Sequence, residues 1–378
     1  MQALIQNVSK YRSKDFDRWC RDLTSDRLIT YIHEKNVIQS HLCALNYFLQ
    51  QCALNKSARE NTNTDSFSMT DVSDEDFKDI CHAAETLQLV SDKEHEKQPE
   101  YVAIIIPGAL QTGFQKRFKL VQDYLKHAKF NGQLFIFGTM DRRLYAFNNN
   151  GVERESATFE LLQERLKLQS VDEVKTLCRK QLDNLLAHND KKSLSEIQIA
   201  HHMADYFEKT YDIVWPNEFD MAQKLLERTS FGNCKIQCIA TTKQQSQHER
   251  ATTEDEAQFV AEALTNVFKN QENVAVAVAS SFSYQLLTYQ TKLPHNIHLD
   301  MLSPYKNITQ YIEQSVKARP QIQNQLNNTQ AIRQLTCTEI FDAFARYIYA
   351  YRALTPVTHE GCARILQLKK KEFNVKQR

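Results

Sequence analysis

The sequence contains unusually little glycine. Only 7 of its 378 residues are glycine, about 2% against roughly 7% in average proteins. Tight turns and phosphate-cradling loops use glycine because it adopts positive φ and lets a backbone approach closely. The scarcity argues against a β-propeller, a β-sandwich and a multi-glycine dinucleotide loop. Helices, which need little glycine, should dominate the fold.

Other familiar signals are missing too. The nine cysteines are scattered and form no C-x-x-C pair, which favours buried, reduced thiols in a reducing compartment. No stretch approaches the ~20 apolar residues of a membrane span, and the N-terminus lacks the basic and apolar regions of a signal peptide. We therefore expect a cytoplasmic protein without a membrane span, and secretion by a route without a signal peptide stays open.

Charge of one sign is not in excess. Lys and Arg number 47 and Asp and Glu 46, for a net charge of +1. This balance gives no reason to expect nucleic acid or an anionic membrane as a partner. The nearest candidate metal cluster, His201, His202 and Asp205, lacks the H-E-x-x-H pattern. We expect no metal site there.

Short apolar runs alternate with helical patterns in the middle of the chain. Such runs are typical of strands buried on both faces of a parallel sheet, and strand–helix–strand order indicates βαβ units. The predicted fold class is α/β: a Rossmann-like parallel sheet flanked by helices, with helical N-terminal, inserted and C-terminal segments. The predicted strands are 101–106, 133–137, 235–241, 273–279 and 297–302.

The same patterns divide the chain. We expect a helical N-terminal region at 1–95, the Rossmann-like domain at 96–305 and a helical C-terminal region at 306–378. Within the domain, 152–230 is predicted to be a helical insertion, because it has one proline and no glycine. Two capping boxes support this prediction, Ser170 with Glu173 and Ser193 with Glu196.

Ligands of an open parallel sheet bind beyond the carboxyl ends of its strands. The first of these ends, 107–113, carries Gly108 and Gly113 where the strand turns into a helix. Backbone N–H groups in such a turn face anions, although the segment is neither G-x-G-x-x-G nor a P-loop. The alternative is a tight turn with no ligand.

Adjacent arginines follow the second strand. Arg142 and Arg143 are suited to clamp a phosphate or carboxylate. The alternative is a surface ion pair with Asp141. In either case the arginines would be exposed, so replacing one with Glu should leave folding nearly intact.

The third and fourth strand ends carry carboxylates and hydroxyls. Glu254 and Glu256 are candidate catalytic residues, as hydrogen-bond acceptors or general bases. The alternative is structural, with Thr253 and Glu256 forming a capping box in an acidic first turn. Ser280 and Ser281 place hydroxyls at a strand–helix junction, either to bind a ligand or to cap the helix. No G-x-S-x-G nucleophile elbow is present.

The order of these four strand ends resembles the YdcF/SanA-like domain family, a Rossmann-like α/β group. The resemblance covers 101–147 and 235–303. Its elements are Gly108 and Arg117 for the glycine turn and its helix, Gly138-Thr139 where the family has Ser-Gly-Gly, Thr253-Glu254-Asp255-Glu256-Ala257 for Thr-x-Glu-Asn-Ala, and Ser280-Ser281-Phe282-Ser283-Tyr284 for Ser-x-x-His. The family's His and Arg after the fourth strand have no clear match, so whether this chain is an enzyme stays open.

The resemblance implies binding of a nucleotide-type or S-adenosylmethionine-type ligand, or hydrolysis at a phosphate-like group. Combined with the strand-end patterns, it gives a hypothesis in which Glu254 and Glu256 are catalytic and the ligand or cofactor contacts Gly108, Gly113, Arg117, Gly138, Thr139, Arg142, Arg143, Thr253, Ser280 and Ser281.

Two functions therefore compete. In the first, the chain binds a small anionic or nucleotide-like molecule, such as S-adenosylmethionine, and acts as a hydrolase or transferase. The alternative is a non-catalytic interaction protein, similar to a bacterial effector, whose helical regions dock a protein partner. A polar pocket over the sheet would favour the first, and a filled crevice the second.

Overall fold

The computed structural model describes residues 72–86, 100–148, 150–188, 194–244, 251–280 and 283–303, with scattered helical positions between 329 and 347. The predicted N-terminal and C-terminal helical regions therefore lie largely outside the described residues. The described part of the N-terminal region is one helix, α6 (Asp74–Thr86). The Ser73 hydroxyl caps it by accepting from the Asp76 N–H at 3.2 Å.

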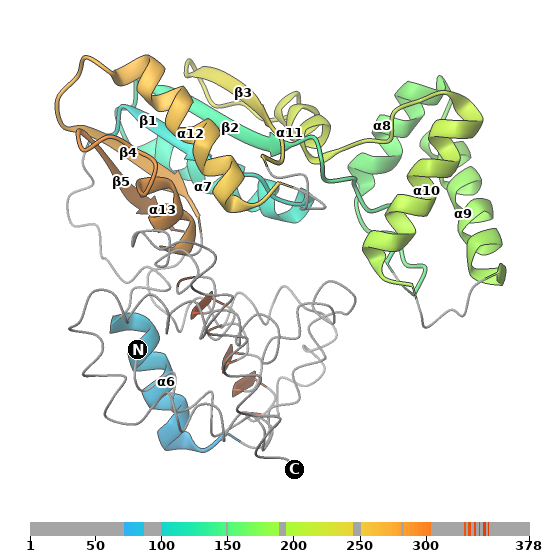
Figure 1. Ribbon diagram of the computed structural model, residues 1–378, viewed down its shortest axis with the longest axis horizontal. Helices are drawn as coiled ribbons and strands as arrows, with labels where there is room; N and C mark the ends of the chain where they lie inside the picture. Colours follow the sequence, from blue (N-terminus) through green and yellow to red (C-terminus); the bar gives the residue numbers. More distant parts are fainter. Residues whose placement is uncertain are drawn as a thin grey trace, which may run out of the picture.

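A five-stranded, wholly parallel sheet forms the centre of the fold (Figure 1). Its order is β3-β2-β1-β4-β5, which confirms the predicted Rossmann-like α/β class. The strands are β1 (Ala103–Ile106), β2 (Gln133–Thr139), β3 (Lys235–Thr241), β4 (Val274–Ala279) and β5 (Ile297–Leu302).

Burial follows the position of each strand. All four residues of β1 are buried because both of its neighbours and both layers of helices cover it. By contrast, β3 is an edge strand, and its Ile236 is 38% exposed. The apolar run at 235–241 therefore predicted the strand but not its position at the edge.

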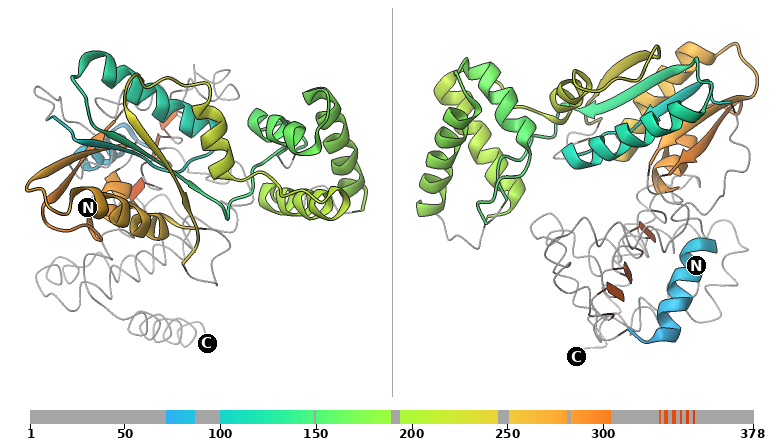
Figure 2. Two further views of the ribbon diagram at one scale, coloured as in Figure 1. Left: turned by 90° about the horizontal axis from the view of Figure 1, so that it is seen from above. Right: turned by 180° about the vertical axis from the view of Figure 1, so that it is seen from behind.

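Helices cover both faces of the sheet (Figure 2). One face packs against α7 (Gln111–His127) and α11 (Glu218–Leu226), and the other against α12 (Thr253–Phe268) and α13 (Ser283–Gln290). Side chains that alternate along each strand enter opposite layers, so that Ile104 and Ile106 face α7 while Ile105 faces α12.

The predicted insertion is mainly helical in its described residues, 152–188 and 194–230, which contain no sheet strand. It has two parts. Helices α8 (Ser156–Leu166), α9 (Val171–His188) and α10 (Glu196–Tyr211) form a lobe to one side of the sheet (Figure 1). The last helix, α11, returns to pack on the sheet and completes the crossover from β2 to β3.

The first turns of α9 and α10 show whether the two predicted capping boxes form. The Ser170 hydroxyl accepts from the Glu173 N–H at 3.2 Å, as expected. The box predicted at Ser193 and Glu196 is wrong, because Glu196 is already the first residue of α10. Ser195 caps this helix together with Gln198. Ser195 and Gln198 fit the same capping-box pattern two residues further along the chain.

The interior of the lobe is aromatic. The Phe147 and Phe159 rings lie 5.6 Å apart, and those of Phe207 and Trp215 lie 5.4 Å apart, all with edge-on geometry. The Trp215 indole N–H donates to the backbone oxygen of Leu144 at 3.0 Å. This bond ties the lobe to the segment that follows β2.

The carboxyl ends of the parallel strands meet at one side of the sheet. We call this side, formed by residues 107–111, 138–145, 241–244, 252–256 and 280, the carboxyl edge. Elsewhere, no helix within the described residues is long and apolar enough to cross a membrane.

Candidate functional site at the carboxyl edge

The strand order creates a switch point between β1 and β4. From β1 the chain proceeds to β2 on one side, whereas β4 and β5 lie on the other side. The helices that follow β1 and β4, α7 and α13, consequently lie on opposite faces of the sheet. Ligands of doubly wound sheets bind in the crevice that such a reversal leaves at the carboxyl ends. At this switch point Gly108 follows the end of β1 and Ser280 follows the end of β4.

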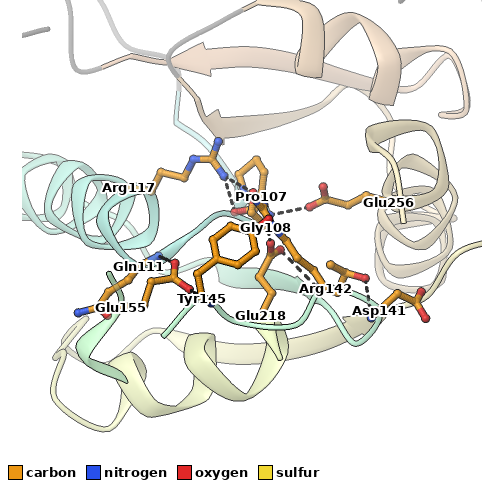
Figure 3. A network of polar contacts seen from close by, with 11 residues as sticks. Pro107, Gly108, Gln111, Arg117, Asp141, Arg142, Tyr145, Glu155, Glu218 and Glu256 are labelled. Atoms are coloured by element: carbon orange, nitrogen blue, oxygen red, sulfur yellow. Dashed lines mark hydrogen bonds and ion pairs between the residues drawn. The ribbon is translucent and has the colours of Figure 1, made fainter. Parts of the chain in front are cut away.

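A buried glutamate occupies this switch point. The Gly108 N–H donates to Oε1 of Glu256 at 2.8 Å (Figure 3). The Glu256 side chain comes from the first turn of α12, and the residue is only 8% exposed. Burial raises the pKa of Glu256 to about 7, and the nearby Glu218 carboxylate contributes to the increase. Glu256 therefore exchanges its proton near neutral pH.

The structural alternative for Glu256 is wrong, because the capping box of α12 lies one residue earlier. The Thr252 hydroxyl accepts from the Asp255 N–H at 3.3 Å, and Asp255 Oδ2 accepts from the Thr252 N–H at 2.7 Å. Thr253 is the first helical residue and does not cap the helix. With the cap formed by Thr252 and Asp255, Glu256 is free to turn inward toward Gly108.

Tyr289 of α13 lies beside Glu256. Its side chain is fully buried, and its hydroxyl lowers the pKa of Glu256 against the effect of burial. Among the described residues, however, this hydroxyl completes no hydrogen bond of ordinary geometry. A buried hydroxyl without a partner is costly, so Tyr289 is a donor in need of an acceptor at the switch point.

Arg117 of α7 links the loop after β1 to α13. Its Nη1 donates to the backbone oxygens of Pro107 and Gly108 at 2.6 and 2.7 Å (Figure 3). Its Nη2 donates to Gln285 Oε1 at 3.2 Å. The Ser280 hydroxyl donates to the same Gln285 oxygen at 2.6 Å. Arg117 and Ser280, both predicted as ligand-binding residues, thus meet at the edge, where they join the end of β1 to α13.

A second buried carboxylate comes from the start of α11. Glu218 is 3% exposed, and its Oε2 accepts from Arg142 Nη1 at 3.1 Å. Its Oε1 accepts a long, weak bond from the Thr139 N–H at 3.4 Å. A Cβ on Gly108 would lie 2.2 Å from this oxygen. A side chain at position 108 would clash with Glu218. This close contact, and not a positive φ, is the reason that glycine is needed there.

Gly138 makes a similar close contact with α11. A Cβ there would lie 2.8 Å from the Cα of Phe219, a backbone atom that cannot move aside easily. The glycines at the ends of β1 and β2 thus let the first turn of α11 rest directly on the sheet. Gly113, by contrast, is in the first turn of α7, where a Cβ would contact the Ala109 side chain, away from Glu218 and Glu256.

Glu155, which precedes α8, is a third buried carboxylate and is 5% exposed. Its two oxygens accept from the Gln111 N–H at 3.2 Å and the Tyr145 N–H at 2.9 Å (Figure 3). Burial raises the pKa of Glu155, and these two bonds partly oppose the increase. It thereby joins the start of α7 to the segment after β2.

The two predicted clamp residues diverge. Arg142 points into the carboxyl edge and pairs with Glu218. Arg143 points to the lobe, where it pairs with Asp205 at 2.9 Å and Glu208 at 3.2 Å on α10. The structure therefore does not bring the two guanidinium groups together. Asp141 pairs with neither arginine and accepts from the Lys243 N–H.

The remaining predicted site residues differ in how far they are buried. Thr139 is buried, and its hydroxyl accepts from the Asp141 N–H at 3.1 Å. Glu254 is half-buried in the first turn of α12. Ser281 lies outside the described residues. Among the described residues, no group of three or more His, Cys, Asp or Glu side chains is arranged to hold a metal ion.

Sequence reasoning missed Glu155, Glu218, Gln285 and Tyr289. Glu155 and Glu218 belong to the predicted insertion, in which acidic residues near helix starts are ordinary. Gln285 and Tyr289 are four residues apart and share a face of α13. This spacing was a visible signal, but only the position of α13 beside the switch point gives it meaning.

A surface cavity of about 260 Å³ lies between α7, α8 and the segment following α11. Phe118, Ala157 and Leu225 line its apolar part, and Lys119 with the Glu160–Arg228 pair lies at its polar part. This cavity is on one face of the sheet and does not include Glu218 or Glu256. It was not predicted from the sequence.

Comparisons with known proteins add no relative to this description. No family model matches the chain, and no significant match was found among curated proteins or solved structures. The resemblance to the YdcF/SanA-like family thus stays a prediction. The fold and the buried groups at the carboxyl edge are the basis on which function can be argued.

Proposed function

We propose that the chain binds a nucleotide-like or S-adenosylmethionine-like small molecule at the carboxyl edge, between the ends of β1 and β4. One observation carries the proposal: Glu256 is buried at the switch point, held by the Gly108 N–H, and has a pKa of about 7. Ionisable groups kept in such surroundings are typical of functional sites, because burying them opposes folding.

The chemistry of Glu256 suits acid–base work as well as binding. With a pKa of about 7, both its neutral and its charged form are populated at neutral pH. The charged form accepts a proton or a hydrogen bond from a ligand, and the neutral form donates one. A hydrolase or transferase activity therefore belongs to the proposal, with Glu256 as the acid–base residue and Glu254, in the first turn of α12, as a second candidate.

The anionic clamp of Arg142 and Arg143 is not part of this proposal. Arg142 is paired with Glu218 and Arg143 with Asp205 and Glu208. The ligand is proposed to contact the loop at Gly108 and the face of α13 that carries Gln285. We further propose a cytoplasmic location and no nucleic-acid partner, on the composition alone.

The interaction-protein alternative keeps one specific observation in its favour. Arg117, Gln285 and Ser280 already bond to one another, so these crevice groups satisfy themselves without a ligand. The lobe of α8–α10, with Val214 beside it at 68% exposure, would then be the surface for a protein partner. This hypothesis requires that no small molecule bind the carboxyl edge.

A thermal-shift screen followed by calorimetric titration separates the two functions. The probes are S-adenosylmethionine, adenosine and ATP, tested on the full chain, since a ligand of the folded state raises the melting temperature. Glu256→Gln should weaken the best probe about tenfold or more, because a charge-assisted hydrogen bond is lost. If none of the three probes binds, the proposal fails and the interaction-protein hypothesis leads.

Glu160→Gln is the matched control. Glu160 carries the same charge on α8 but pairs with Arg228 at the surface, outside the carboxyl edge. Its substitution should leave the affinity unchanged. Because Glu160 also lines the cavity between α7, α8 and the segment following α11, an equal loss of affinity in both variants would contradict a specific role of Glu256 in binding.

A further inference from the structure

Backbone N–H groups at the carboxyl edge donate to carboxylates of the protein itself. In parallel α/β sheets these are the groups that otherwise face a ligand's anion. Their acceptors come from the first turns of α11 and α12, from the residue before α8 and from the segment after β2, not from neighbouring strands. The pairs are Gly108 with Glu256, Gln111 and Tyr145 with Glu155, Thr139 with Glu218, Lys243 with Asp141, and Gln244 with Asp255.

Glu218 is the clearest case of a carboxylate in the place of a ligand. Its Oε1 lies where a side chain of Gly108 would be, and its Oε2 pairs with Arg142. The glycine and the arginine that the sequence marks as anion-binding residues thus both contact an internal anion (Figure 3). A phosphate placed there would have to displace Glu218 from a position where it is 3% exposed.

Most hydrogen-bonding positions that stay unused at the carboxyl edge are acceptor positions of carboxylates. An ionised carboxylate has about four acceptor positions, whereas Glu256 receives one backbone bond at 2.8 Å and Glu218 one backbone and one side-chain bond. Two buried donors complete no hydrogen bond among the described residues: the Tyr289 hydroxyl beside Glu256, and Nε of Arg142, whose Nη1 pairs with Glu218. A ligand hydroxyl at the switch point would accept from the Tyr289 hydroxyl and donate to the Glu256 carboxylate.

We infer that the ligand of this site is recognised through hydrogen-bond donors, with or without positive charge, and not through a phosphate group. An ammonium or the hydroxyls of a ribose have this chemistry, and S-adenosylmethionine carries both, together with a sulfonium that adds positive charge but no donor. The inference rests on the proposed function and narrows its ligand class. Phosphate oxygens would meet Glu155, Glu218 and Glu256 at close range in surroundings of low dielectric, where like charges repel strongly.

Two pairs of probes, each differing in one charged group, test the inference by calorimetric titration of the full chain. Adenosine and ATP share a nucleoside and differ by the triphosphate. S-adenosylmethionine and S-adenosylhomocysteine differ by a methyl group and its positive charge. We expect adenosine to bind about tenfold or more tightly than ATP. The first pair tests rejection of phosphate, and the second shows whether charge adds to the hydroxyl donors.

The outcomes separate the inference from the function on which it rests. If ATP binds more tightly than adenosine, the inference is overturned while small-molecule binding stands. If no probe binds, the proposed function is overturned and the inference with it. Equal affinities for adenosine and ATP would overturn the inference as well, because they would show that the carboxylates do not act on the phosphates.

A variant measures the role of Glu218 directly. Glu218→Gln keeps the size and one acceptor oxygen but removes the charge, so the preference for adenosine over ATP should fall by about tenfold. Glu160→Gln on the surface should keep the wild-type preference. Should Glu218→Gln not fold, Glu256→Gln provides the same comparison from the other side of Gly108. An unchanged preference in the folded variant would overturn the inference.

Discussion

The lobe of α8–α10 and the carboxyl edge keep their charges in opposite places. The lobe has an aromatic interior around Trp215, and its ion pairs, such as Lys175–Glu153 at 2.8 Å, are at the surface. The carboxyl edge buries Glu155, Glu218 and Glu256 beneath backbone N–H donors. Apolar groups of similar size would often serve stability as well as a buried ion pair does. The comparison teaches that the lobe has the arrangement expected for stability alone, whereas the edge buries charges that stability alone does not require.

The largest expected effect is a loss of stability when the aromatic interior of the lobe is disrupted. Trp215→Ala removes a side chain that is 1% exposed together with its bond to Leu144. We expect a loss of about 3–5 kcal/mol in the free energy of unfolding, measured with urea. The control is Val214→Ala, the adjacent residue at 68% exposure, which should cost close to nothing. A loss below about 1 kcal/mol for Trp215→Ala would contradict the description of the lobe.

The next prediction contrasts two neighbouring arginines. Arg142→Met leaves Glu218, 4% exposed, without its cation, and we expect a loss of about 3 kcal/mol. Arg143→Met removes pairs in which Asp205 is 55% and Glu208 32% exposed, and should cost about 0–1 kcal/mol. The structure thus changes the sequence-based expectation for Arg142, whose Nε is buried and unpaired within the described residues. Equal losses of unfolding free energy for the two variants, measured with urea, would contradict the distinction between a buried Arg142 pair and exposed Arg143 pairs.

A smaller effect tests the contact between Gly108 and Glu218. Gly108→Ala places a Cβ 2.2 Å from Glu218 Oε1, so one of them must move. We expect a loss of about 2 kcal/mol in unfolding free energy. A double-mutant cycle supplies the control, because the loss should shrink when Gly108→Ala is made together with Glu218→Ala. The same loss in both backgrounds would place the strain elsewhere.

The smallest effect per measured step is a slope of the free energy of unfolding with pH. The pKa of Glu256 is raised from 4.5 to about 7 in the fold, so between these values the folded state holds a proton that the unfolded state has released. Its contribution to stability is complete below pH 4.5 and is lost as the pH rises through about 7. The difference in unfolding free energy between wild type and Glu256→Gln should change by up to about 1.4 kcal/mol per pH unit in this window. A difference independent of pH would show that Glu256 is not shifted.

The sequence predicted the sheet far better than the site. The strands and the helical insertion follow from local periodicity, since an apolar run such as 101–106 or 273–279 has few other ways to be buried. The capping residues were missed by one or two positions because Thr252 and Thr253, or Ser193 and Ser195, satisfy the same pattern. For this reason the capping box predicted for Thr253 and Glu256 was placed one residue too late.

The carboxylates from the insertion could not be predicted from the sequence. Glu218 is 110 residues from Gly108 in the chain, and its position depends on how α11 rests on Gly108 and Gly138. Likewise, the adjacent arginines gave no indication that Arg142 and Arg143 point to different parts of the molecule. These contacts are tertiary, and no local pattern encodes them.

A crystal structure of the full chain with its best-binding probe tests the central claim most directly. The account predicts electron density for the ligand between Gly108 and Ser280, with a donor atom of the ligand within hydrogen-bond distance of the Glu256 carboxylate and Glu218 still paired with Arg142. A ligand seated in the cavity between α7, α8 and the segment following α11, or one whose phosphate displaces Glu218, would contradict it.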